Sequence, residues 1–250
     1  MQELTEEQSL RYSRHIRLQG VGEEGQKKIM AANVLIVGTG GLGSPISLYL
    51  AAAGIGHIGL IDADKVDLSN LQRQVIHFTK DIDRPKVESA KEKILAVNPN
   101  VTVSTFQEFL DKDNALDIIK SYDFIVDATD NFDAKFLISD TCVKAGKPFS
   151  YAGVLRFNGQ TFTHLPGTAC LRCLYREAPP AGTVPNSSQA GVLGATVGML
   201  GTIQATETLK YFTGAGELLT NRLLTFDALT MEFRTINVKR NAECKACGNK

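Results

Sequence analysis

The chain carries no excess of charge of either sign, since it has 27 lysine and arginine residues and 27 aspartate and glutamate residues. That balance offers no support for a nucleic-acid or anionic-membrane partner. The N-terminal segment "MQELTEEQSLRYSRHIRL" lacks the apolar core of a secretory signal. The most apolar helical candidate, residues 191–209, reaches polar and charged residues too soon to cross a bilayer. We therefore expect a cytoplasmic protein.

Histidine and cysteine are scarce. The five cysteines do not resemble the framework of a secreted, disulfide-stabilised domain. Four of them instead form two CxxC pairs, and the fifth, Cys142, lies in a helix that we expect to pack against a sheet. The histidines form no catalytic pattern, and we expect all four to be structural: His15, His57, His77 and His164.

The CxxC pairs are Cys170/Cys173 and Cys244/Cys247. Four thiolates are enough for a closed tetrahedral zinc site, in which no coordination position stays open for water. Such a site is structural, and here it would hold the C-terminal tail on the domain. The alternative is a redox CxxC, which usually opens a helix beside a thioredoxin-like sheet. Two pairs favour zinc, and the long gap between them means that the fold must bring them together.

Apolar, strand-like runs alternate with helical patterns from "NVLIVG" to "KPFSYAGVL". This alternation predicts an α/β fold with a Rossmann-like, mainly parallel sheet flanked by helices. After residue 150 the pattern changes to alternating runs, which predict antiparallel strands that extend the sheet, and a zinc-bound tail ends the chain. Another α/β domain of unspecified function fits the pattern at this level.

The stretch "NVLIVGTGGLGSP" carries a GxGxxG pattern between an expected strand and an expected helix. Its glycines, Gly38, Gly40 and Gly43, let backbone N–H groups approach a phosphate at a helix N-terminus. Asp62 lies 22 residues after Gly40, at the end of the next expected strand, where it can accept hydrogen bonds from ribose hydroxyls. The sequence therefore predicts a nucleotide site, with an NAD-dependent oxidoreductase as one alternative and a non-catalytic nucleotide-binding scaffold as another.

Charged and amide side chains crowd the sequence directly after Asp62. Taken singly, such residues are usually solvated surface groups. Because they are clustered beyond the ribose position, they suit a triphosphate better than a nicotinamide ring. The members of this cluster are Asp64, Asn70, Arg73, Gln74 and Lys86.

Four longer motifs are more specific than GxGxxG: "GTGGLGSP", "DADKVDLSNLQRQ", "DRPKVESA" and "DATDNFDAKFLISDTCVKAGKP". Together with "RYSRHIRL" and both CxxC pairs, they resemble the ThiF/MoeB/HesA family over nearly the whole chain. Members of that family are related to ubiquitin-activating enzymes and adenylate small sulfur-carrier proteins. The resemblance implies ATP and Mg²⁺ as cofactors, structural Zn²⁺, and a ubiquitin-like carrier of the thiamin or molybdopterin type as partner.

The resemblance also assigns roles to residues. Gly40 and Gly41 would lie along the phosphates, Asp62 would hold the ribose, and Asp130 would hold Mg²⁺. Arg14 would reach into the nucleotide site of a neighbouring subunit, which implies a homodimer. The residues expected to surround the triphosphate are Asn70, Arg73, Gln74 and Lys86, and the catalytic set is Arg14, Arg73, Lys86 and Asp130.

The same resemblance divides one adenylation domain, residues 1–250, into three parts. Residues 1–32 would contribute to the dimer, 33–150 would form the nucleotide-binding core, and 151–250 would bind the carrier and zinc. The loop from Tyr175 to Gln189 is the candidate cover for the carrier's Gly-Gly tail. Ser187 stands where many relatives carry a cysteine, so we expect the enzyme to stop at the acyl-adenylate. A separate sulfur donor, such as a cysteine desulfurase or a rhodanese, would complete the thiocarboxylate.

Overall fold

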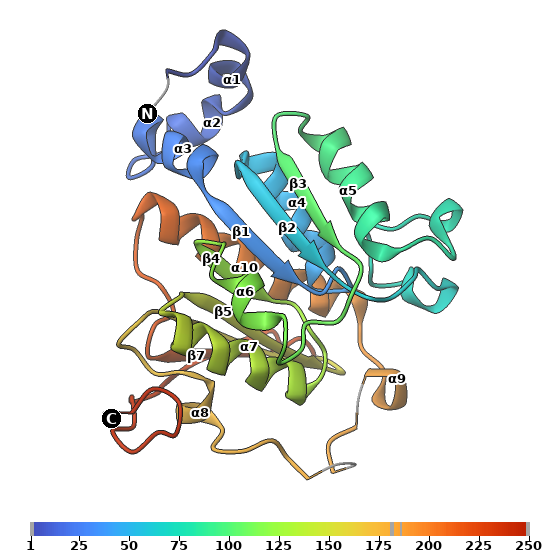
Figure 1. The fold of residues 1–250 in the computed structure, drawn as a ribbon, viewed down its shortest axis with the longest axis vertical. Helices are drawn as coiled ribbons and strands as arrows, with labels where there is room; N and C mark the ends of the chain where they lie inside the picture. The colour runs from blue at the N-terminus through green and yellow to red at the C-terminus, as the bar shows by residue number, and fades with distance from the viewer. Residues whose placement is uncertain (1–2, 181–182, 186, 249–250) are drawn as a thin grey trace.

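A computed structural model describes residues 3–180, 183–185 and 187–248 of the chain, without the side chains of residues 187 and 188. Its centre is an eight-stranded sheet in the order β3-β2-β1-β4-β5-β6-β7-β8 (Figure 1). Neighbouring strands are parallel from β3 to β5 and antiparallel from β5 to β8. The predicted fold class is therefore confirmed. The strands are β1 (Asn33–Val37), β2 (His57–Ile61), β3 (Thr102–Phe106), β4 (Phe124–Asp127), β5 (Phe149–Leu155), β6 (Asn158–His164), β7 (Arg222–Asp227) and β8 (Glu232–Asn237).

Helices cover both faces of this sheet, and in Figure 1 α6 and α7 lie in front of it while α4 lies behind β1 and β2. The α-helices are α1 (Glu6–Arg11), α2 (Ser13–Ile16), α3 (Gly22–Ala31), α4 (Gly43–Ala53), α5 (Lys86–Val97), α6 (Ala115–Ile119), α7 (Phe132–Ala145), α8 (Leu171–Leu174), α9 (Ser187–Ala190) and α10 (Gly194–Thr213). Two 3₁₀ turns, η1 (Leu68–Asn70) and η2 (Thr79–Asp81), lie between β2 and α5.

The unbroken apolar run in β1 follows from its place at the middle of the sheet. Val34 and Ile36 belong to the hydrophobic cluster that includes residues of α4, α5 and α10, whereas Leu35 and Val37 belong to the cluster that includes residues of α6 and α7. Because successive side chains point to opposite faces, a strand covered on both faces must be apolar at every position. This burial fixes the position of the glycine loop that follows β1.

Two glycines of α10, Gly194 and Gly201, lie where this helix comes close to its neighbours. A Cβ atom on Gly201 would lie 2.6 Å from the Pro45 side chain of α4, and one on Gly194 would lie 2.3 Å from the Gln72 carbonyl. Small residues are therefore required where α10 meets α4 and the chain before Arg73.

The N-terminal segment "TEEQSLRYSRHIRL" forms two short helices, α1 and α2, and not one continuous helix. Tyr12 interrupts it between α1 and α2, with φ −98° and ψ 12°. The Tyr12 side chain is 3% exposed, and its hydroxyl accepts a hydrogen bond from Asn98 Nδ2 at 2.8 Å. Because its side chain is anchored in the core, Tyr12 breaks the helix at this position. Tertiary packing decides this break, and local helix propensity does not.

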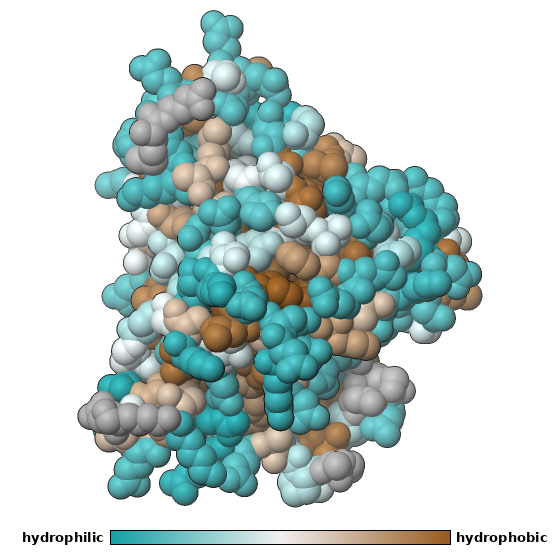
Figure 2. All heavy atoms as spheres, in the orientation of Figure 1, coloured by the Kyte–Doolittle hydropathy of each residue, from teal (hydrophilic) through white to brown (hydrophobic). Residues whose placement is uncertain are grey.

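The segment predicted as a loop between Tyr175 and Gln189 is largely irregular, but it ends in the short helix α9. Its described residues are 175–180, 183–185 and 187–189, so part of this prediction lies outside the described residues. Among the described residues, no helix is long and apolar enough to cross a membrane. Figure 2 shows that the apolar residues on the viewed face lie in small areas among hydrophilic ones.

Candidate functional site

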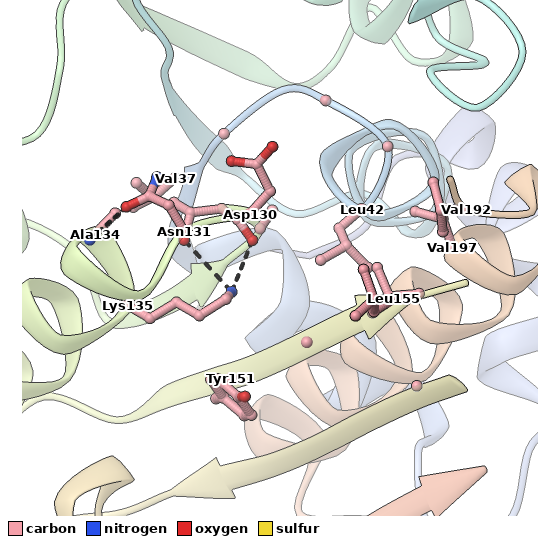
Figure 3. Close-up of a pocket in the computed structure, with 18 of the residues that line it drawn as sticks. Val37, Leu42, Asp130, Asn131, Ala134, Lys135, Tyr151, Leu155, Val192 and Val197 are labelled. Atoms are coloured by element: carbon pink, nitrogen blue, oxygen red, sulfur yellow. Dashed lines mark hydrogen bonds between the residues drawn. The ribbon is translucent and has the colours of Figure 1, made fainter. Parts of the chain in front are cut away.

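A cavity of about 730 Å³ opens at the carboxyl ends of β1, β2 and β4, where the order of the parallel strands reverses. This is the place where open α/β sheets bind their ligands. Residues of β5 to β8 also line the cavity, so one space joins the glycine loop to the antiparallel part of the sheet. Figure 3 shows Tyr151 and Leu155 of β5 beside this space. The predicted residues that line it are Gly38, Gly40, Gly41, Asp62, Asp64, Arg73, Gln74, Lys86 and Asp130.

The glycine loop requires small residues for two different reasons. Gly38 has φ +95°, and a Cβ there would lie 2.9 Å from the Ala128 carbonyl oxygen. Gly43 does not line the cavity, because it begins α4, and a Cβ there would lie 2.1 Å from the Gly38 carbonyl oxygen. Gly38, Gly40 and Gly41 therefore present backbone to the cavity, whereas Gly43 lets the helix pack against the loop.

Asp62 holds the shape of this loop as well as lining the cavity. Its Oδ2 accepts hydrogen bonds from the backbone N–H of Thr39 at 2.8 Å and from the Thr39 hydroxyl at 3.0 Å. Its Oδ1 accepts from the backbone N–H of Asp64 at 2.9 Å. Each carboxylate oxygen has a further lone pair, so Asp62 can also accept hydrogen bonds from a ribose.

His77 supports the loop from behind and is structural, as predicted. Its Nε2 lies 2.9 Å from the Thr39 carbonyl oxygen, and its Nδ1 lies 2.9 Å from the Ser89 hydroxyl. Burial lowers the pKa of His77 below its ordinary 6.5. The other histidines also have structural partners, with His15 beside Gln26, His57 beside Ser104 and His164 beside the Ala169 carbonyl.

Two cations line the cavity near the glycine loop. Lys86 is 6% exposed, and its Nζ donates to Asp64 Oδ2 at 2.8 Å. Arg73 is half-buried, and its Nη1 donates to the Ser69 carbonyl at 3.0 Å. Neither side chain has all of its N–H donors occupied by these bonds, so both keep donors for an anion in the cavity.

Two amide residues predicted to surround the triphosphate lie in different places. Gln74 is 4% exposed and lines the cavity, and its Oε1 has no hydrogen-bond partner among the described residues. Asn70 does not line the cavity, because its Oδ1 accepts from the backbone N–H of Asp67 at 3.2 Å and closes the turn η1. Within one chain, Asn70 therefore shapes the segment that carries Arg73.

Asp130 is exposed at the mouth of the cavity, and its carboxylate has no hydrogen bond or ion pair with any described residue. Figure 3 shows this carboxylate pointing toward the loop between β1 and α4. The Asn131 side chain instead accepts a hydrogen bond from the Ala134 N–H at 2.9 Å and caps α7. A free carboxylate beside a phosphate-binding loop is available to a hard cation.

A buried pair beneath Asp130 was not predicted as part of the site. Lys135 lines the cavity although it is only 5% exposed, and its Nζ lies 3.3 Å from the carboxylate of Asp127, which is 1% exposed. Both residues belong to the quoted motif "DATDNFDAKFLISD". A lysine on the apolar side of an expected helix was the signal that would have identified the pair.

Arg14 lies apart from the cavity. It is exposed on α2, next to the N-terminal end of the chain, and does not line the space between the glycine loop and β8 (Figure 1). The structure of one chain therefore brings Arg14 to none of the other predicted catalytic residues.

The part of the cavity over the antiparallel strands has a polar floor that the sequence did not reveal. Gln160, Thr225 and Arg234 lie opposite one another on β6, β7 and β8. Asn158, Asp227 and Glu232 form a second row in the same register. Both rows line the cavity, and Val184 and Pro185 of the segment before α9 line it as well. An extended peptide can lie on such a floor beneath the segment.

The four paired cysteines meet in space, although 74 residues separate Cys170 from Cys244. Their four sulfurs all lie within 4.8 Å of one another, with Cys170 Sγ 3.6 Å from Cys244 Sγ and Cys173 Sγ 3.4 Å from Cys247 Sγ. Tetrahedral coordination at about 2.3 Å separates sulfurs by similar distances. The cluster is therefore compatible with a metal site.

The surroundings of this cluster shift the pKa values of two of its thiols in opposite directions. Burial raises the pKa of Cys170, and neighbouring thiols raise it further. Burial opposes ionisation of Cys244 too, but the backbone N–H groups of Cys247 and Ala246 lower its pKa to about 7. These N–H groups therefore favour the thiolate of Cys244, which is the form that binds a cation. Cys142, by contrast, is fully buried in α7, where desolvation raises its pKa, as expected for a core cysteine.

Comparison with known proteins agrees with this geometry. The model of the ThiF family matches residues 12–246. The SAMP-activating enzyme E1 of Haloferax volcanii is 44% identical over 238 residues, covering 95% of this chain and 88% of that protein. The sulfur carrier protein adenylyltransferase of Thermus thermophilus is 42% identical, covering 98% of this chain and 93% of that protein.

Some relatives are longer than this chain. The probable adenylyltransferase/sulfurtransferase MoeZ of Mycobacterium tuberculosis is 44% identical, but the chain spans only 62% of its length. Among solved structures, E. coli MccB with ATP superposes with a TM-score of 0.85 at 25% identity, covering 96% of this chain and 75% of that chain. The chain therefore corresponds to the part that these proteins share.

Proposed function

This chain belongs to the ThiF family, and on that premise we propose that it adenylates the C-terminal glycine carboxylate of a small ubiquitin-like sulfur-carrier protein, using ATP. One observation carries the proposal. A single cavity joins the glycine loop, with Arg73 and Lys86 beside it, to the polar floor on β6 to β8. The names of two relatives, a SAMP-activating enzyme E1 and a sulfur carrier protein adenylyltransferase, support the same activity.

The residues around the loop fit a nucleoside triphosphate with Mg²⁺. Gly38 and Gly41 present backbone to the cavity, and the buried Oε1 of Gln74 has no hydrogen-bond partner in the described part of the chain. The Asp130 carboxylate has no partner among the described residues and points to the same loop (Figure 3). Bound Mg²⁺ would supply positive charge that offsets the phosphate charge during transfer.

The proposed reaction needs no general base. The carrier's carboxylate is already ionised at neutral pH. One of its oxygens attacks the α-phosphorus, the bond to the bridging oxygen breaks, and pyrophosphate leaves with that electron pair. Lys86 and Arg73 keep N–H donors for the charge that develops on the phosphates, which is the main contribution a protein makes to such a transfer. Asp62 would hold the ribose.

The carrier's tail is proposed to lie on the floor formed by β5 to β8. Gly153 lies opposite Gln160 on this floor, so β5 presents backbone there instead of a side chain. An extended Gly-Gly segment has no side chains either, so it can lie close to such a surface and direct its carboxylate toward the glycine loop. Val184 and Pro185 are placed to cover it.

Zinc is proposed as the ion of the four-cysteine cluster. The donor set is sulfur alone, since no histidine or carboxylate of the described residues joins the four cysteines grouped there. Such a set is typical of closed, structural zinc sites. Zinc would attach the segment after β8 to α8, which carries Cys173. A cytoplasmic location agrees with this site, since reducing conditions keep the thiols free.

A homodimer is also part of the proposal, because Arg14 belongs to the catalytic set and lies outside its own chain's cavity. Residues 1–32 would form part of the dimer contact, 33–150 would bind the nucleotide, and 151–250 would bind carrier and zinc. Asn70, which points away from the cavity in one chain, would act on the phosphates only after η1 rearranges.

A separate sulfur donor, such as a cysteine desulfurase or a rhodanese, is proposed to follow the adenylation. Ser187 stands at the position of the family cysteine, and its side chain lies outside the described residues. The other candidate nucleophile, Cys142, is buried in α7. Mass analysis under non-reducing conditions, after incubation with ATP and carrier, is expected to show no covalent enzyme–carrier adduct. An adduct on Cys142 would contradict this step.

Exchange of labelled pyrophosphate into ATP tests the activity. We expect exchange only when a small carrier ending in Gly-Gly is present, and loss of exchange when the terminal glycine is removed. An oxidoreductase would instead change the absorbance of a nicotinamide cofactor, and a non-catalytic scaffold would bind ATP without exchange. Either of those results would overturn the proposed function.

A further inference from the structure

The Lys135 ammonium group is fully engaged by the protein. Its Nζ donates to the Ala152 carbonyl at 2.6 Å and to the Thr129 carbonyl at 2.7 Å, and it lies 3.3 Å from both carboxylate oxygens of Asp127. An ammonium group has three N–H donors. Since three groups already accept from it, Lys135 has no donor left for a phosphate or a carrier carboxylate, in contrast to Lys86.

These contacts join the segment that carries Asp130 to the strand β5, on which the carrier's tail is proposed to lie. Thr129 directly precedes Asp130, the proposed Mg²⁺ ligand, and its N–H and hydroxyl both donate to Asp127 Oδ1. Ala152 directly precedes Gly153, which lines the floor proposed for the carrier's tail. β4 and β5 are paired only at Ile125–Phe149 and Val126–Ser150, so the strands themselves do not connect Thr129 to Ala152. Lys135 makes that connection.

Figure 3 shows the same arrangement from the cavity. The Lys135 side chain rises from α7 to the backbone beneath Asp130 and Asn131, and the Asp130 carboxylate points away from it, toward the loop between β1 and α4. Tyr151 lies on the other side of Lys135, whose Nζ is 5.2 Å from the centre of the Tyr151 ring.

We propose that Lys135 is a positioning residue that sets the Asp130 segment at a fixed distance from the carrier floor on β5. It acts on the reaction through Thr129 and Ala152 and touches neither substrate. This inference rests on the proposed adenylation. Displacement of one reacting group by about 1 Å can lower a rate by about a hundredfold, so a residue that holds both sides affects turnover more than binding.

The test compares Lys135→Met, which keeps the alkyl chain and removes the ammonium, with the matched control Lys93→Met. Lys93 is also a buried lysine, with a side chain 7% exposed, and it is paired with the fully buried Asp81, but it does not line the cavity. The double variant Asp127→Asn/Lys135→Met removes both charges of the pair, so no unpaired charge stays buried and folding is preserved better than in the single variant.

We expect Lys135→Met and the double variant to lower kcat for carrier-dependent pyrophosphate exchange by about a hundredfold, with each KM changed by less than about threefold. Lys93→Met is expected to lower thermal stability while kcat stays within about twofold of wild type. Unchanged kcat in the double variant, or an equal loss in Lys93→Met at the same folded fraction, would overturn the inference.

Hydrogen exchange separates this inference from the proposed activity. Amides of residues 127–134 are expected to exchange faster in the double variant than in wild type, whether or not a carrier has been found, and to be unchanged in Lys93→Met. Equal protection in the double variant would refute the inference by itself. If the wild-type protein shows no carrier-dependent pyrophosphate exchange, the proposed function is refuted. The amide hydrogen exchange of residues 127–134 would then still decide whether Lys135 positions the Asp130 segment.

Discussion

Lys86 and Asp64 form an ion pair of 2.8 Å in which the lysine side chain is 7% exposed and the aspartate side chain 58% exposed. The cation is therefore held at the wall of the cavity by a carboxylate that water reaches. A phosphate that enters the cavity can replace Asp64 as the partner of the buried Lys86 ammonium. The Asp64 carboxylate, which water already reaches, then returns to solvent at little cost. The pair thus holds the Lys86 side chain at the cavity wall before ATP binds.

Lys86→Met is expected to lower adenylate formation by about a hundred- to a thousandfold, because a preorganised charge at the phosphates is lost. Lys65→Met is the matched control, since Lys65 is exposed nearby and does not line the cavity. The measurement is pyrophosphate exchange at saturating ATP and carrier. Near-normal exchange by Lys86→Met would remove this residue from the catalytic set.

Arg14→Ala is expected to abolish activity in its own dimer but to be complemented by Lys86→Ala. A mixed dimer contains one site in which both residues are intact. If subunits exchange freely, an equal mixture should recover about a quarter of wild-type activity, since half of the dimers are mixed and each has one good site. No recovery, after subunit exchange has been verified, would show that Arg14 does not act across the dimer.

Metal removal is expected to release the C-terminal segment without unfolding the sheet. Purified, reduced protein should contain about one zinc ion per chain. Because metal binding contributes to folding free energy, removal that costs about 3 kcal/mol would lower Tm by about 6 to 12 °C. Cys244→Ser, combined with limited proteolysis, should expose the segment after β8. Absence of zinc in unoxidised protein would contradict the assignment.

His77 is expected to make stability depend on pH. Its pKa in the folded chain lies below the ordinary 6.5 because it is buried, so the unfolded chain binds the proton more readily. Stability is then complete above about pH 6.5 and falls as the pH decreases toward the folded pKa. Urea unfolding between pH 7 and pH 5 should show a shallower decline for His77→Gln than for wild type. Parallel curves would exclude this role.

The sequence was sufficient for the features that local chemistry determines. The run Val34 to Val37, apolar at each position, predicts a strand covered on both faces, and the structure confirms it. Gly38 and Gly43 also follow from local pattern, although only the structure separates their tasks. Asn70 looked equivalent to Gln74 in the sequence, but its side chain closes η1 and does not line the cavity, because a turn residue can bond its own backbone instead of a ligand.

By itself the sequence determined the order of strands and helices, the glycine loop and the supply of four thiols, since each depends on residues close together in the chain. Only the tertiary structure decided that Cys170 meets Cys244, that Tyr12 interrupts the first helix, and that Lys135 joins Thr129 to Ala152. Those contacts link residues far apart in sequence or depend on burial that no local pattern records. The packing of helices against the twisted sheet selects them, because a buried polar group must find its partner wherever the fold provides one.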